Sequence, residues 1–157
     1  MNTKRKLCFI INLILSLAIM TVIFLFSTES GDTSADRSSS LKETLLSFLD
    51  PVLPDLIYNF IDEHIRQLAH FTLYFLLGIT VSMATKCVII HPIFPYITSF
   101  VICFVYALSD ELHQYFVPGR SCRIIDIGID SLGAILSISL HLFIVLIIKH
   151  KEIKSTW

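Results

Sequence analysis

A run of twenty residues without a charged side chain, from Leu7 to Phe26, is the feature that most constrains how this chain folds. As an α-helix, such a run is about 30 Å long, which matches the hydrocarbon core of a bilayer. Lys4, Arg5 and Lys6 precede it. The run is longer than the apolar part of a secretory signal peptide, roughly 7–15 residues, and no Ala-x-Ala cleavage site follows it. We therefore expect an uncleaved membrane anchor.

The composition extends this expectation to the whole chain of 157 residues. Hydrophobic residues make up 54% and charged residues 16%, and the mean hydropathy is +0.74. Soluble domains carry about 25% charged residues. The net charge of −1 leaves no basic surface for a nucleic acid, and the four cysteines form no CxxC pair. We expect a single all-α membrane domain over residues 1–157, with membrane lipids around it and no nucleic-acid partner.

Three further apolar runs follow the first. Together they predict a bundle of four transmembrane helices, over residues 7–26, 68–85, 89–109 and 124–148. Residues 27–40 are small and polar and are expected to form a loop that ends at a helix start. After them, Leu41, Leu45, Phe48 and Leu49 recur at helical spacing. This pattern predicts a short helix that lies along the membrane surface in the first outer loop.

Four spans place both termini on one side of the membrane. Seven of the 12 Lys and Arg residues then lie on the side of the termini. They are Lys4, Arg5, Lys6, Lys86, Lys149, Lys151 and Lys154. Because cytoplasmic loops carry the excess of Lys and Arg, the termini are expected in the cytoplasm. The polar motifs between the helices are then expected at the extracytoplasmic boundary.

Two of the predicted helices carry polar residues four positions apart, which places them on one helix face. Arg66, His70 and Tyr74 follow one another in this way, and so do Asp126 and Asp130. A carboxylate inside a spanning segment is costly unless it faces the bundle interior and has a partner. These residues are therefore candidates for a binding or acid–base site, whereas headgroup-level exposure or packing is the simpler explanation for each alone.

The segment SDELHQYFVPGR brings a second polar group to the same level. Asp110 and Gln114 are four residues apart, and Glu111 is three residues before Gln114. Pro and Gly at positions 118 and 119 predict a turn that carries Arg120 back over the membrane surface. The planar guanidinium of Arg120 suits a carboxylate or phosphate held by two hydrogen bonds. Ser27 ends the first span at the same depth.

Three segments carry a resemblance to a known family. They are STES after the first span, RQLAHFTLYFLLG, and SDELHQYFVPGRSCRIIDIGIDSLGA. Together they resemble the VanZ-like family of bacterial integral membrane proteins, and the match extends over all four predicted helices. Asp130 is a departure, since that family usually has Asn there. The resemblance implies the cytoplasmic membrane of a bacterium, a role in the cell envelope, and a connection with resistance to the glycopeptide teicoplanin.

These features predict an outer-facing polar site that binds or modifies an anionic lipid-linked or cell-wall precursor. The alternative is a non-catalytic binding or structural protein whose polar cluster locks the helix bundle. Whether the protein is an enzyme stays open, because no nucleophile motif is present. The candidate catalytic residues are His70, Asp110, Glu111 and Asp126. The candidate substrate-binding residues are Ser27, Arg66, Tyr74, Gln114, Arg120 and Asp130.

Cofactors and oligomeric state are less constrained. No HExxH-like spacing marks a metal site, so no cofactor is expected from motifs. The carboxylates and histidines of the polar cluster are nevertheless of the residue types that bind metals, so a divalent metal is the alternative expectation. The oligomeric state stays open.

Overall fold

The computed structural model describes residues 2–49 and 55–155, and this part of the chain is helical throughout its regular structure. The helices are α1 (Thr3–Ser27), α2 (Gly31–Leu49), α3 (Asp55–Val88), α4 (Phe94–Tyr115) and α5 (Ile124–Ser155). Within these residues there is no strand. The expectation of an all-α fold is therefore confirmed.

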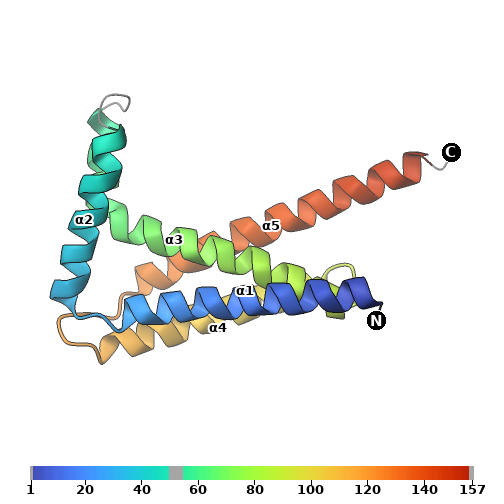
Figure 1. The fold of residues 1–157 in the computed structure, drawn as a ribbon, viewed down its shortest axis with the longest axis horizontal. Coiled ribbons are helices and arrows are strands. Elements are labelled where there is room, and N and C mark those ends of the chain that lie inside the picture. Colours follow the sequence, from blue (N-terminus) through green and yellow to red (C-terminus); the bar gives the residue numbers. More distant parts are fainter. Residues whose placement is uncertain (1, 50–54, 156–157) are drawn as a thin grey trace.

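Helix α3 is central to the arrangement, because it packs against α1, α4 and α5. Helices α1, α3 and α4 run along one another, while α5 leans away toward its C-terminal end (Figure 1). Both chain termini lie at the same end of these helices. Helix α2 stands across the other end of these helices (Figure 1).

Three helical segments in the described residues are long and apolar enough to cross a membrane. They are Thr3–Ser27, His64–Val88 and Ile124–Lys151, and they contain the runs predicted at 7–26, 68–85 and 124–148. The fourth predicted run, 89–109, falls mostly on α4, which is not among the three. Helix α4 begins at Phe94 rather than at residue 89, with Pro95 in its first turn. It also extends beyond residue 109 through the polar residues up to Tyr115, which lower its hydropathy.

The prediction of a loop over residues 27–40 is wrong for most of that segment, since α2 begins at Gly31. Ser30 supplies the physical reason. Its hydroxyl accepts a hydrogen bond from the backbone N–H of Thr33 (3.4 Å), and its carbonyl accepts one from Ser34 N–H (2.9 Å). Ser30 therefore caps the helix. The negative charge of Asp32 in the first turn also stabilises the helix, because it lies near the positive end of the helix dipole. The backbone of the predicted surface helix belongs to α2, but the side chains of Leu41, Leu45, Phe48 and Leu49 lie outside what the structure describes.

Small residues allow α3 and α5 to approach closely. A Cβ atom on Gly133 would lie 2.5 Å from the backbone oxygen of Phe71, and one on Gly78 would meet Ala134 and Ser137. Close approach through Gly, Ala and Ser is the usual way in which membrane helices pack, because lipid provides no hydrophobic drive for their association. Gly78 and Gly133 therefore mark the close contact between α3 and α5.

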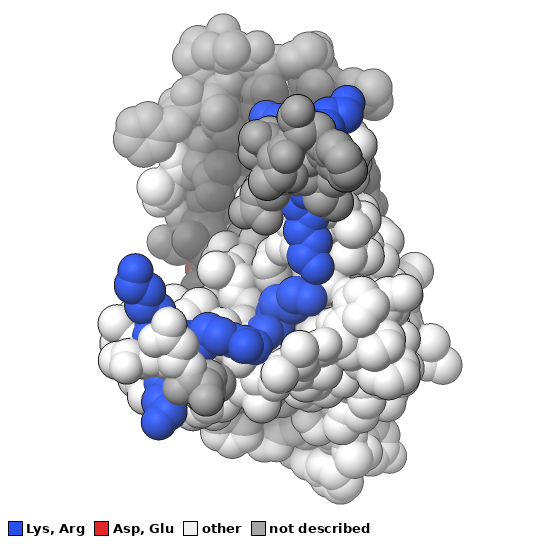
Figure 2. Space-filling view, turned by 90° about the vertical axis from the view of Figure 1, so that its right-hand side faces the viewer, with Lys and Arg blue, Asp and Glu red and all other residues white. Residues whose placement is uncertain are grey.

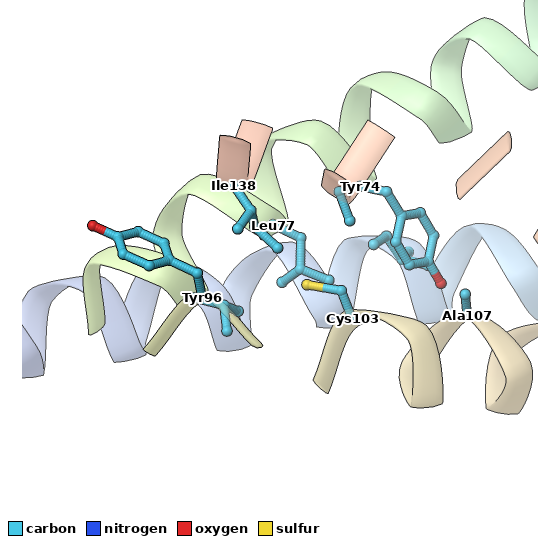
Figure 3. Close-up of a cluster of buried hydrophobic side chains, with 9 residues drawn as sticks. Tyr74, Leu77, Tyr96, Cys103, Ala107 and Ile138 are labelled. Carbon is cyan, nitrogen blue, oxygen red and sulfur yellow. The ribbon is translucent and has the colours of Figure 1, made fainter. Parts of the chain in front are cut away.

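The core between the helices is small, and its buried members include Tyr74, Leu77, Cys103 and Ala107 (Figure 3). In contrast, large apolar side chains cover the outside, for example Ile14 at 60% exposure and Val105 at 56%. Exposed apolar surface of this extent is typical of a protein that is surrounded by lipid. At the end near the termini, the sulfur atoms of Cys8 and Cys87 lie 3.1 Å apart, a contact that the sequence did not predict.

We expect Gly133→Ala to lower the free energy of unfolding by roughly 2 kcal/mol, because the added methyl group would overlap the α3 backbone. Gly128→Ala is the matched control on the same helix, since a Cβ there meets nothing within 4 Å. It should leave stability unchanged or raise it slightly through helix propensity. Thermal unfolding of both variants in detergent checks this, and equal unfolding temperatures would contradict the packing of α3 on α5.

Candidate functional site

The end of the helices opposite the termini gathers the polar residues that the sequence singled out. Each helix contributes through its own periodicity: residues four apart share a face on α3 (Arg66, His70), α4 (Asp110, Gln114) and α5 (Asp126, Asp130). Ser27 adds the last residue of α1. The predicted site residues therefore lie in one region, which has two chemically different halves.

In the first half, Asp110 and Gln114 are almost fully buried, at 3% and 0% exposure, and their polar atoms are paired. Ser27 Oγ donates to Asp110 Oδ1 at 2.5 Å. Gln114 Nε2 donates to Asp110 Oδ2 at 2.9 Å and to Ser27 Oγ at 3.2 Å. These bonds tie the end of α1 to α4. We call Ser27, Asp110, Gln114 and Arg120 the hydrogen-bonded lock.

Arg120 completes the lock from the loop after α4. The predicted turn is present: Gly119 has a φ of +74°, and Pro118 O accepts a hydrogen bond from Gly31 N–H at 3.1 Å. Arg120 Nε donates to Glu29 O at 3.0 Å, and Nη2 donates to Phe26 O at 2.7 Å. Arg120 thereby donates hydrogen bonds to backbone carbonyls at the C-terminal end of α1 and just beyond it.

The side-chain oxygen of Gln114 joins two cations. Arg120 Nη1 donates to Gln114 Oε1 at 3.0 Å, and Arg66 Nη2 donates to the same oxygen at 3.1 Å. Burial lowers the pKa of the Arg120 guanidinium from its ordinary value, and the nearby Arg66 charge lowers that pKa further. Two guanidinium groups held this close create a strongly positive spot that favours an anion.

The second half contains buried polar atoms without hydrogen-bond partners among the described residues. They are both carboxylate oxygens of Asp130, one oxygen of Asp126 and the hydroxyl of Tyr74. His70 Nδ1 lies 3.8 Å from Asp130 Oδ2, which is too long for a hydrogen bond. Buried polar groups in folded proteins are normally paired, so this half is the unusual one. We call His70, Asp126 and Asp130 the open half.

Glu111 lies at the margin of the open half, beyond the predicted span 89–109. Its side chain is 1% exposed, and its Oε2 accepts a hydrogen bond from the backbone N–H of Arg123 at 2.9 Å. Burial raises the pKa of the Glu111 carboxyl above its ordinary value. The hydrogen bond from Arg123 opposes this rise in pKa, and the charge of Asp126 adds to it. Glu111 can therefore hold a proton more readily than an exposed carboxyl.

Two adjoining cavities meet at this end of the protein, and Arg66 and His70 line both. The first has about 230 Å³ of space, including space open to solvent, and carries three carboxylates. Its other lining residues are Gln67, Glu111, Asp126, Ile129 and Asp130. The second has about 400 Å³, again including space open to solvent, and combines cations, one carboxylate, hydroxyls and apolar side chains. Its other lining residues are Phe26, Glu29, Ser34, Ser38, Ile65, Ala69 and Arg120.

Sequence reasoning missed Ser34 and Ser38, which bring α2 into the site. Their spacing of four was a usable signal, but the segment was interpreted as loop. It also missed the buried polar contacts toward the other end, where Ser82 Oγ and His141 Nδ1 share a hydrogen bond of 2.8 Å. Nothing in the local sequence pairs Ser82 with His141, because they lie 59 residues apart.

With the geometry established, comparison with known proteins identifies the family. The sequence profile of the VanZ/LLP1 family matches residues 12–147, which include the whole polar site. The chain belongs to the VanZ/LLP1 family. The resemblance seen in the sequence is therefore confirmed. Neither the curated proteins nor the solved structures contain a significant match to the chain.

Proposed function

We propose that this VanZ/LLP1 family member is a cell-envelope membrane protein that binds an anionic headgroup at the extracytoplasmic end of its helices. The ligand class is the phosphate or carboxylate headgroup of a lipid-linked or cell-wall precursor. The observation that carries the proposal is the second cavity, in which the Arg66 and Arg120 side chains line the same space as apolar ones. A site for an anionic lipid headgroup needs this combination of positively charged and apolar side chains.

The chemistry of that cavity suits a phosphate in particular. Arg66 uses one of its donors on Gln114, and Arg120 uses three nitrogens on the protein, so both keep further N–H groups. Ser34 adds a hydroxyl donor from α2, whereas the Ser38 hydroxyl donates to the backbone oxygen of Ser34. Phe26, Ile65 and Ala69 form the apolar part of the wall, against which an acyl or prenyl chain can lie.

The proposed orientation rests on charge. Figure 2 looks at the end that carries both termini, where Lys and Arg gather and Asp and Glu are barely visible among the described residues. Under the positive-inside rule, this charge supports a cytoplasmic location for the end with the termini, and hence an outer location for the polar site. Helix α4 serves as the fourth span in this proposal, because it packs along α3 and α5. Helix α2, which stands across the outer end, lies along the membrane surface.

A second candidate is an enzyme that modifies the same ligand. It is favoured by the open half (His70, Asp126 and Asp130), which lies beside the second cavity, where Arg66 and Arg120 form part of the lining. Groups that can exchange protons, placed next to a bound phosphate, are what acid–base chemistry requires. A purely structural role is favoured only for the hydrogen-bonded lock, whose members are satisfied by one another. It leaves the unpaired carboxylates without an explanation.

We expect Arg66→Gln to reduce co-purified anionic lipid at least tenfold, because one charge-assisted contact contributes more than the roughly 1.4 kcal/mol that a factor of ten requires. Arg123→Gln is the matched control, since only its backbone N–H takes part in the site and its side chain is exposed. Lipids are extracted from equal amounts of purified protein and quantified by mass spectrometry. Chemical change of the bound lipid over time would establish the enzymatic candidate.

Strains that produce wild type, Arg66→Gln or Arg123→Gln connect the site with drug susceptibility. If the family's link with teicoplanin acts through this site, the change in teicoplanin susceptibility that wild type confers should be absent with Arg66→Gln, at equal membrane abundance of the two proteins. Equal lipid content in the Arg66→Gln and Arg123→Gln proteins would contradict the proposed headgroup site.

The orientation makes its own prediction, because Cys122 is exposed in the loop before α5. A membrane-impermeant maleimide should label Cys122 in intact cells, and Cys122→Ser should remove that label. Cys103 is buried, and Cys8 and Cys87 lie near the opposite end, so they should contribute little. Labelling of Cys122 only after the membrane is permeabilised would reverse the orientation.

A further inference from the structure

We propose that His70, Asp110 and Asp130 form a binding site for one divalent metal ion at the junction of α3, α4 and α5. One ligand atom from each of the three side chains lies within 4.8 Å of the others. Two ligands of one ion lie no farther apart than about 4.2 Å, since each bond is about 2.1 Å long. Small side-chain rotations therefore complete the site, without a change in the helix packing.

Asp130 gives an independent reason to expect a cation here. Its side chain is 0% exposed and lines the acidic cavity, yet neither of its oxygens has a hydrogen-bond partner among the described residues. An uncompensated carboxylate at such a place is strongly unfavourable. The imidazole at 3.8 Å is too distant to satisfy it. A metal ion would satisfy both the charge and the coordination of Asp130.

The charges around the cavity lead to the same conclusion. Four carboxylates (Asp110, Glu111, Asp126 and Asp130) are buried or half-buried at this end, against the guanidinium groups of Arg66 and Arg120. The carboxylates therefore outnumber the guanidinium groups around Asp130. A divalent cation next to Asp130 would offset this excess.

The surroundings of Asp110 resemble the outer shell of a metal site. Ser27 and Gln114 each donate a hydrogen bond to its carboxylate and so fix its orientation. Partners of this kind commonly orient a ligand and tune the metal that it holds. One imidazole and two carboxylates favour Zn²⁺ or Mn²⁺ over Mg²⁺ or Ca²⁺, which prefer oxygen ligands alone. Two of the three ligands, His70 and Asp130, line the cavity that Arg66 also lines.

The test measures metal content. Purified protein is stripped with a chelator and equilibrated with Zn²⁺ or with Mn²⁺. Free metal is then removed, and bound metal is determined by mass spectrometry. Wild type should hold about one ion per chain, and the metal should raise its unfolding temperature. Asp130→Asn and His70→Gln should each lose at least tenfold in bound metal.

His141→Gln is the matched control, because His141 also lies on a membrane helix but pairs with Ser82 away from the site. It should retain the metal, and Arg66→Gln should retain the metal even where it loses lipid. Failure of the metal site is thereby distinguished from failure of the headgroup proposal. Wild-type protein without bound metal, or Asp130→Asn with as much metal as wild type, would overturn the inference. If neither site variant folds, the metal dependence of wild-type unfolding decides.

Discussion

The structure depends on the hydrogen bonds that Gln114 makes at the centre of the polar end. Its amide donates to Asp110 and Ser27, while its oxygen accepts from Arg66 and Arg120. A single buried side chain thus connects α1, α3, α4 and the loop that precedes α5. An amide is suited to this position because it offers donors and an acceptor at once, which a carboxylate or an ammonium group does not. In a protein whose helices meet through small residues and face lipid, such polar connections fix the relative depth of the helices.

Other buried polar atoms at this end take no part in the hydrogen bonds of Gln114, and they indicate where a ligand could bind. The lock satisfies Asp110 completely, whereas Asp130 and Asp126 lie close by with unpaired oxygens. Ionisable groups buried in membrane helices without hydrogen-bond partners lower stability, and in many proteins they mark functional sites. In our two proposals, the cavity lined by Arg66 and Arg120 binds an anionic headgroup, and His70, Asp110 and Asp130 bind a cation beside it.

Much of this was predictable from the sequence where a local rule applies. Spacing by four placed Arg66 with His70 and Asp126 with Asp130, and Pro118–Gly119 correctly predicted the turn that returns Arg120 to the helix ends. What the sequence could not provide is the choice of partners. The contact of Ser27 with Asp110 spans 83 residues, and only packing of α1 against its neighbours decides it. Likewise, Arg120 was expected to hold a ligand with its fork, but most of its contacts go to the carbonyls that end α1.

The division into a satisfied lock and an open half is tested most directly by thermal unfolding of two neutralised variants in the presence of a chelator. Asp110→Asn should unfold at a lower temperature than wild type, because the new amide cannot accept from both Ser27 and Gln114. Asp130→Asn should unfold at a higher temperature, because it removes a buried carboxylate that accepts no hydrogen bond. Both are Asp-to-Asn changes in the same cluster, so each serves as the control for the other. A loss of stability in Asp130→Asn as large as that in Asp110→Asn would contradict the account.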